Sequence, residues 1–438
     1  MVCRLKKGDF MEMTAKLKKQ CLLTVVFGAF AIFFTGYPHV WSIYQPYVME
    51  RAGWSQGQAS ICFYLALSTF VFGNIVGGKL QTQCNARIVV WTGGGIFTAG
   101  ILASAFLMIP SPVPMYLTYG IMQGFGQGMI YTSILATVQK WFPDRTGFAS
   151  GVVITANGLC GFFLAPLSRR ILENSGPKTA FLTIGAFIAL SWILCSIFFV
   201  SPENNVQTSD DGNKEKAEII YQTKQYTSAE MMHTGNFYLL LATMMFGLMS
   251  YFMMSPVSQT YQTDHGISPA VAVSAVMLGS IVNAGARLIL PTISDKIGRV
   301  VCIKGVLIAT MIAMSALAVS RSYVITAAIV LMYGCYGGIM GSFPSFTSAI
   351  FGVKNTGENY GFVMIGIVIA TFGAPVISGM VQQKGYSMNI VFGIGAGFAV
   401  AAFVCLSLLG RNLKAGKQKG EKKDGSGNNE RTAGTRRK

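Results

Sequence analysis

The chain contains twelve apolar stretches, each close to the ~20 residues that a helix needs to cross the hydrocarbon core of a membrane. Charged residues make up 12% of the chain, about half of the ~25% that is usual in soluble domains. We therefore predict an all-α membrane protein with twelve spans, a count that a broken or re-entrant helix would change by one. The predicted spans are residues 22–44, 58–79, 88–109, 114–138, 148–168, 179–200, 236–258, 269–291, 300–318, 323–345, 359–380 and 388–409.

Basic residues are distributed unequally between the two sides of this predicted bundle. If both termini are cytoplasmic, the inner segments hold 27 Lys and Arg residues and the outer loops hold 6. An excess of basic residues in cytoplasmic loops sets the orientation of membrane proteins, so we predict cytoplasmic N and C termini. The same bias accounts for the net charge of +17, and we expect a lipid bilayer and no nucleic acid as partner.

A polar segment divides the twelve spans into six and six. Residues 201–235 are rich in Asn, Asp, Glu and Lys without an apolar stripe, which indicates a flexible cytoplasmic linker. Residues 1–200 are then an N-terminal six-helix bundle with a basic start, and residues 236–410 form a C-terminal one. Residues 411–438 are too charged and glycine-rich to fold alone, so we predict a basic disordered tail.

The two halves also resemble each other in pattern. The segments VQKWFPDRTGFASG (138–151) and SAIFGVKNTGENYG (348–361) both place an aromatic residue at the membrane exit, then a basic residue and a glycine. Duplicated six-helix halves are typical of transporters with a site at the midplane. The repeat therefore favours a transporter built from two pseudo-symmetric bundles.

Arg287 is the one charged residue that lies well inside an apolar span. Its guanidinium is protonated at any physiological pH, and bilayer depth costs such a group at least ~2.5–3.5 kcal/mol on insertion scales. The side chain is therefore expected to face a water-filled cavity or an anion. A structural contact with a backbone carbonyl or a helix end is the alternative.

Several motifs carry a resemblance to a known family. SDKIGR (294–299) resembles the loop signature of the major facilitator superfamily. KWFPDRTGFASG (140–151), NAGAR (283–287) and NYG (359–361) resemble the oxalate:formate antiporter branch, which is related to the monocarboxylate transporters. The resemblance implies two six-helix bundles, alternating access, and a bacterial or archaeal plasma (inner) membrane. In the first half the loop signature is weakened, with Thr82 where Asp is usual.

The resemblance also implies roles for particular residues. In that family an arginine at the position of Arg287 binds the substrate carboxylate, and Tyr131 occupies the tyrosine of the family's GxGxGxxY run. The oxalate carrier uses a lysine in the eleventh span, but the matching residue here is Ile367. A site with one positive charge instead of two is expected to take a monocarboxylate in preference to oxalate.

A second departure from the family concerns proton coupling. Proton-coupled monocarboxylate transporters resemble one another in an Asp four residues before the arginine, where this chain has Asn283. An amide does not titrate, so anion exchange or uniport is the natural interpretation. His39, midway along the first span, could titrate near neutral pH, which leaves proton symport as an alternative. It could instead form a hydrogen bond between two helices.

Other polar residues in the spans are candidates for the substrate pathway. Tyr37, Tyr64 and Tyr333 could surround a small anion, or anchor the helices at the interfaces. Gln127 could line the pathway or bridge helices. The loop residues are expected to form a conformational latch through Arg–Asp pairs and helix-end dipoles; they are Asp295, Lys296, Arg299, Asp144 and Arg145.

The composition argues against other functions. Nine cysteines occur singly and only three histidines are present, so we expect no metal site and no cofactor. No nucleophile–base pair or ATP-binding loop suggests an enzyme. The sequence predicts a monomeric secondary transporter for a small carboxylate, with a membrane sensor that binds a metabolite without transporting it as the alternative.

Overall fold

The computed structural model describes residues 15–142, 145–201, 225–320 and 322–434, which contain helices and no strand. Nine of these helices are long and apolar enough to cross a membrane. The other three predicted spans fall on interrupted helices or on the second half of the bent helix Thr146–Phe198. The all-α fold predicted from the sequence is confirmed.

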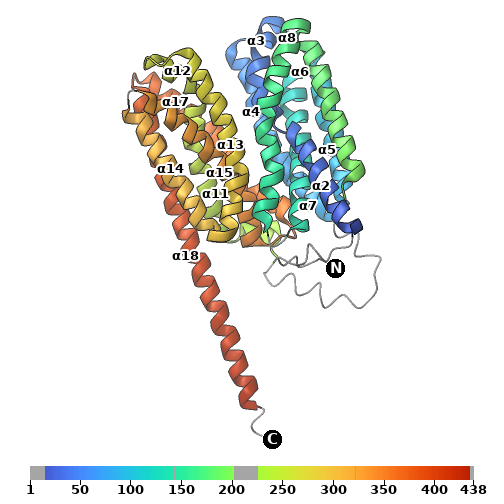
Figure 1. The fold of residues 1–438 in the computed structure, drawn as a ribbon, viewed down its shortest axis with the longest axis vertical. Helices are drawn as coiled ribbons and strands as arrows, with labels where there is room; N and C mark the ends of the chain where they lie inside the picture. The colour runs from blue at the N-terminus through green and yellow to red at the C-terminus, as the bar shows by residue number, and fades with distance from the viewer. Residues whose placement is uncertain (1–14, 143–144, 202–224, 321, 435–438) are drawn as a thin grey trace.

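The first group of helices, blue to green in Figure 1, precedes the segment 202–224. It comprises α2 (Ala15–Phe34), η1 (Tyr37–Val40), α3 (Trp41–Ala52), α4 (Gln56–Gln83), α5 (Ala86–Ser104), α6 (Val113–Met115), the π-helical η2 (Tyr116–Gln123), α7 (Gly124–Trp141) and α8 (Thr146–Phe198). The helix α8 contains two spans, because its backbone turns at Gly176 (φ 76°) before Pro177.

The second group, yellow to red in Figure 1, follows that segment. It comprises α10 (Ser228–Met232), α11 (Gly235–Met254), η6 (Ser255–Val257), α12 (Ser258–Asp264), α13 (Pro269–Ile297), α14 (Arg299–Val319), α15 (Tyr323–Phe351), α16 (Thr356–Val363), α17 (Ile365–Gln383) and α18 (Met388–Gly434). The structure continues α18 past the bundle as one helix (Figure 1), through much of the tail for which the composition predicts disorder.

Two spans are interrupted at equivalent places in the two groups. The 3₁₀ turn η1 carries Pro38 between α2 and α3, and the 3₁₀ turn η6 carries Pro256 between α11 and α12. Proline has no amide hydrogen and clashes with the preceding turn, so it weakens the helix at these two places. Interrupted helices in matching positions of two halves are a feature of transporter binding sites.

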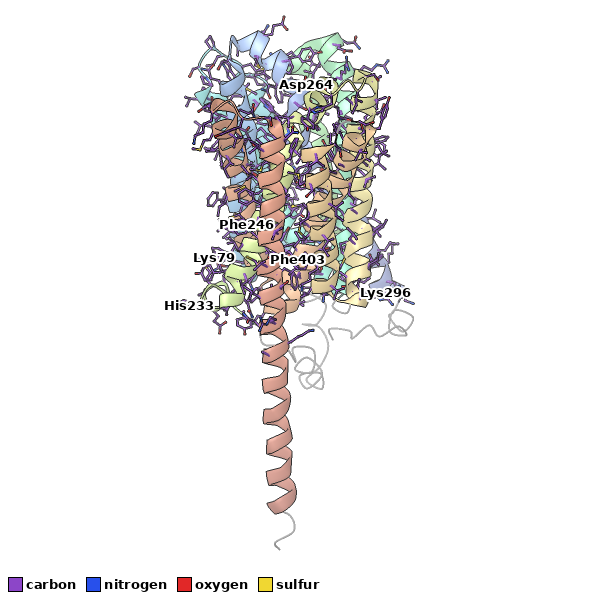
Figure 2. All side chains as sticks on the ribbon, turned by 90° about the vertical axis from the view of Figure 1, so that its left-hand side faces the viewer. Lys79, His233, Phe246, Asp264, Lys296 and Phe403 are labelled. Atoms are coloured by element: carbon purple, nitrogen blue, oxygen red, sulfur yellow. The ribbon has the colours of Figure 1, made fainter. Side chains whose placement is uncertain are left out.

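The two groups lie side by side, and the ends of the molecule in Figure 1 are referred to below as the upper end, near α3 and α12, and the lower end, near α7. Figure 2 shows Lys79 and Lys296 at the lower end and Asp264 at the upper end. Between the groups, α13 packs against α8 and α16 packs against α4. Large apolar side chains such as Phe72 and Val301 are exposed on the outside, as expected for a surface that faces lipid.

Candidate functional site

A cavity of about 600 Å³ lies between the two groups of helices. It extends from the middle of the molecule toward the upper end, where Gln45 of α3 and Ser258 of α12 form part of its wall. Both proline turns contribute, through Pro38 and Pro256. The remaining lining residues are Trp41, Ser42, Phe63, Tyr64, Asn157, Gly158, Gly161, Tyr251, Phe252, Ser255, Val276, Ser280, Asn283, Arg287, Tyr333, Tyr336, Thr371 and Pro375.

Arg287 of α13 reaches this cavity although it is only 2% exposed. Its Nε donates to Oδ1 of Asn283, one helical turn earlier, at 2.9 Å. Its Nη1 donates to Oδ1 of Asn157, on α8 of the other group, at 2.6 Å. The guanidinium also lies over the ring of Tyr336, 5.6 Å from its centroid, which is a cation–π distance.

The partners of Arg287 are all neutral. None of the ion pairs among the described residues includes it, and it is the one charged side chain among the described residues that line the cavity. A buried cation without a counterion is costly, and amide oxygens compensate it only in part. The arrangement can therefore bind an anion, whose charge would complete the pairing.

Metal binding has no comparable support. Nowhere in the described ranges do three His, Cys, Asp or Glu side chains gather in a group that could hold a metal ion. The chemistry available in the cavity is thus hydrogen bonding, aromatic contact and a single positive charge.

Asn157 links Arg287 to a chain of amides in the first group. Its Nδ2 donates to Oγ1 of Thr35 at 3.0 Å, and Gln127 donates to the carbonyl oxygen of the same threonine. Gln123 in turn donates to Gln127 at 2.6 Å. Gln127, predicted as a pathway residue, therefore lies behind the cavity wall and supports Asn157 through Thr35.

Three tyrosines of the second group form one wall of the cavity. The rings of Tyr251 and Tyr336 stack with centroids 4.0 Å apart and an interplanar angle of 15°. Tyr333 meets Tyr251 edge-on at 5.6 Å. Tyr333 and Tyr336 are three residues apart on α15 and so share a face, a spacing from which Tyr336 could have been predicted. Tyr251 stands in an apolar, Met-rich run that gave no such signal.

Only some of the residues predicted as substrate ligands line the cavity. Asn283, Tyr64 and Tyr333 line the cavity together with Arg287, and Tyr64 contacts the ring of Phe372 at 5.8 Å. The side chain of His39 lies outside the described part of the structure, although its backbone belongs to η1.

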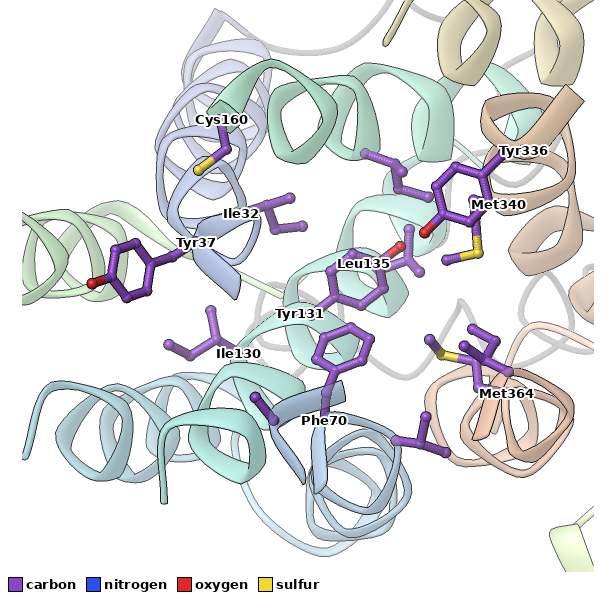
Figure 3. Close-up of a cluster of buried hydrophobic side chains, with 14 of the residues drawn as sticks. Ile32, Tyr37, Phe70, Ile130, Tyr131, Leu135, Cys160, Tyr336, Met340 and Met364 are labelled. Carbon is purple, nitrogen blue, oxygen red and sulfur yellow. The ribbon is translucent and has the colours of Figure 1, made fainter. Parts of the chain in front are cut away.

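Tyr131 and Tyr37 are buried outside the cavity wall. Tyr131 packs edge-on against Phe70 at 5.2 Å. Figure 3 shows its hydroxyl directed toward that of Tyr336. Tyr37 points away from this pair in Figure 3 and packs instead against Tyr44, at 5.5 Å. The family motif located Tyr131 along the chain, but could not show whether it lay in the cavity wall.

The lower end is closed by contacts between the two groups. Asp295, near the end of α13, accepts hydrogen bonds from the backbone amides of Gly147 at 3.3 Å and Phe148 at 3.0 Å, in the first turn of α8. Arg299 donates to Asp295 at 3.0 Å and to Oγ1 of Thr146 at 3.0 Å. A carboxylate at a helix N-terminus is stabilised by the free amides and the helix dipole.

Two other predicted latch residues, Lys296 and Arg145, are exposed at the lower end and have no part in this contact. Asp144 lies outside the described residues. Gly147 is required by the geometry, because a Cβ there would stand 2.6 Å from both carboxylate oxygens of Asp295.

A second, uncharged connection closes the lower end. Gln139 of α7 donates to Oγ of Ser150 at 2.6 Å and accepts from Oγ of Ser348, on α15 of the other group, at 2.6 Å. Thr132 donates to the carbonyl oxygen of Gly357 at 3.1 Å. These residues could not be predicted from the sequence, because polar side chains near span ends carry no distinctive pattern.

Comparison with known sequences agrees with this architecture. The sequence profile of the Major Facilitator Superfamily matches residues 24–366. An uncharacterized MFS-type transporter, YhjX of Escherichia coli (strain K12), is 26% identical over 353 residues, which are 80% of this chain and 85% of the relative. The oxalate:formate antiporter of Oxalobacter formigenes is 26% identical over 392 residues, or 87% and 90%. Human monocarboxylate transporter 11 is 34% identical over 122 residues, covering only 28% and 26%.

The solved structures show the same fold. The transporter FucP in its outward conformation superposes with a TM-score of 0.66 at 13% identity, covering 89% of this chain and 99% of FucP. At this identity the likeness concerns the fold alone.

Proposed function

This chain belongs to the Major Facilitator Superfamily, and on that premise we propose that it carries a small monocarboxylate across the membrane by alternating access. The observation that carries the proposal is the buried guanidinium of Arg287, which faces the cavity and has only amide partners. A carboxylate accepts two hydrogen bonds from a guanidinium in a bidentate pair, so it fits this position better than a neutral solute does.

The proposed preference for monocarboxylates over dicarboxylates follows from the charges at the site. Arg287 is the one cation among the described lining residues, and a second carboxylate would enter the cavity without a positive partner. The oxalate:formate antiporter is a relative, but Ile367 stands where the resemblance places its second cation. Oxalate is therefore expected to bind less well than a monocarboxylate.

Anion exchange or uniport is the proposed mode of transport. The residue one turn before Arg287 is Asn283, whose amide holds Nε at 2.9 Å and cannot release a proton. The described lining residues include no carboxylate that could take that role. A proton-coupled symport through His39 would require that histidine to titrate during the cycle.

The direction of opening follows from the predicted orientation. If the protein lies in a plasma membrane with both termini in the cytoplasm, the lower end faces the cytoplasm and the cavity opens to the outside of the cell. Transport then requires the Asp295 and Gln139 contacts to break while the upper end closes, with Arg287 between the two gates. We propose that a monomer suffices, because the cavity is formed within one chain.

Counterflow in proteoliposomes tests this function. Vesicles are loaded with unlabelled formate, lactate or oxalate, and uptake of labelled solute is followed with no proton gradient. Exchange of a monocarboxylate with weak exchange of oxalate supports the proposal. Strong oxalate exchange would contradict the reasoning from charge, whereas binding of a carboxylate without any uptake would favour a sensor.

A further inference from the structure

Thr371 is a cavity residue to which neither the motifs nor the charges assign a role. It lies on α17, is 2% exposed, and forms part of the cavity wall. Its Oγ1 has no hydrogen-bond partner in the structure. A buried hydroxyl without a partner is uncommon, because the group loses its hydrogen bonds to water on burial.

Other buried threonines in the spans do not behave in this way. The hydroxyls of Thr243, Thr310 and Thr347 each donate to the backbone carbonyl four residues earlier, at 2.7, 2.9 and 2.9 Å. This local bond is the usual solution for a threonine inside a helix. Thr371 makes no such bond to the carbonyl of Ile367, so neither its donor nor its acceptor capacity is used by another group of the protein.

Thr371 and Arg287 reach the cavity from different sides. The helix α13, which carries Arg287, packs against α8 and α15, whereas α17 packs against α11 and α4. The ring of Tyr64 on α4 contacts that of Phe372 on α17, so these two helices meet next to Thr371. A ligand held by its carboxylate at Arg287 shares the cavity with Thr371, which lines it from another helix.

We propose that Thr371 is a specificity-determining residue that hydrogen-bonds a neutral polar group of the substrate, such as a hydroxyl or keto oxygen carried beyond the carboxylate. The proposal rests on the proposed carboxylate transport. A hydroxyl can donate or accept, so it pairs with either kind of oxygen. The cavity of about 600 Å³ is also far larger than formate requires, which leaves room for such a substituent.

Matched pairs of acids test this assignment. Competition by lactate and propionate, and by 3-hydroxybutyrate and butyrate, is measured against counterflow of a labelled monocarboxylate. In the wild-type protein the hydroxylated member of at least one pair is expected to compete about 3- to 10-fold better, the effect of one neutral hydrogen bond. Thr371→Val, which keeps the shape, is expected to bring this ratio close to one, and Thr371→Ser to preserve it.

Thr243→Val is the matched control, because that threonine is equally buried but bonds only its own helix. It should leave the ratio unchanged. Equal weakening of both acids by Thr371→Val, or no hydroxyl preference in the wild type, would overturn the assignment while leaving carboxylate transport intact. If no carboxylate competes in an Arg287-dependent manner, the proposed function itself fails, and the role of Thr371 with it.

Discussion

Nη1 of Arg287 donates to Oδ1 of Asn157 at 2.6 Å, and this hydrogen bond joins the two groups of helices at the base of the cavity. The donor is a cation and the acceptor is neutral, so a carboxylate that enters the cavity is a stronger partner for the same guanidinium. Binding of an anion would therefore compete with a contact that connects the halves. Substrate recognition and the relative position of the halves are coupled through one side chain.

Removal of the Asn157 amide should change carboxylate affinity and the rate of exchange in opposite directions. In Asn157→Ala the guanidinium loses its cross-group acceptor, so a carboxylate no longer has to displace it, and we expect carboxylate affinity to rise about 3- to 10-fold. Maximal exchange should fall, because the halves lose a bond that positions them. Saturation of counterflow measures both quantities. A loss of affinity would mean that Asn157 contacts the substrate itself.

An acidic residue at position 283 should compete with the substrate for Arg287. Asn283 Oδ1 lies 2.9 Å from Nε of Arg287, so Asn283→Asp would place a carboxylate against the guanidinium. The internal ion pair would compete with the substrate, and exchange at pH 7 should fall at least about tenfold. The ion pair would also stabilise the charged form of the new carboxylate, so acidification from pH 7 to 5 should leave exchange low. Asn283→Leu serves as the control without a titratable group, and equal activity of the two variants at both pH values would argue against this role.

Asp295 should affect the rate of the cycle and not the binding of substrate. The carboxylate accepts two amides at the start of α8 and bonds Arg299, all at the lower end. Asp295→Asn removes the charge that interacts with the helix dipole, a contribution of about 0.3–1 kcal/mol, and turnover should change about 2- to 5-fold. The concentration for half-maximal exchange should stay the same. Lys296→Gln, an exposed neighbour at the same end, is the matched control and should leave turnover unaltered.

The fold was largely predictable from the sequence, because apolar stretches of bilayer length have few alternatives to helices. The breaks at η1 and η6 coincide with Pro38 and Pro256, but proline alone does not predict a break, because Pro291 and Pro344 lie inside continuous helices. The tail differs. Its composition predicts disorder, whereas α18 continues to Gly434.

The candidate site was predictable only in part. Arg287 was identified because one charge in an apolar span is conspicuous, and Asn283 because it stands where the resemblance to proton-coupled monocarboxylate transporters places an Asp. Tyr251 and Thr371 were not identified, because their position in the cavity wall depends on how the helices are oriented toward one another. Gln139 and Ser348 are 209 residues apart, and no local pattern indicates that they meet.

The most direct test of the account compares an acid with its neutral amide. Binding of lactate and lactamide to the purified protein is measured by calorimetry for the wild type and for Arg287→Gln, which keeps a hydrogen-bond donor but removes the charge. The account predicts that the wild type prefers lactate at least about 30-fold and that Arg287→Gln, still folded in the membrane, loses this preference. An unchanged preference for lactate in Arg287→Gln would contradict the claim that this guanidinium binds the carboxylate.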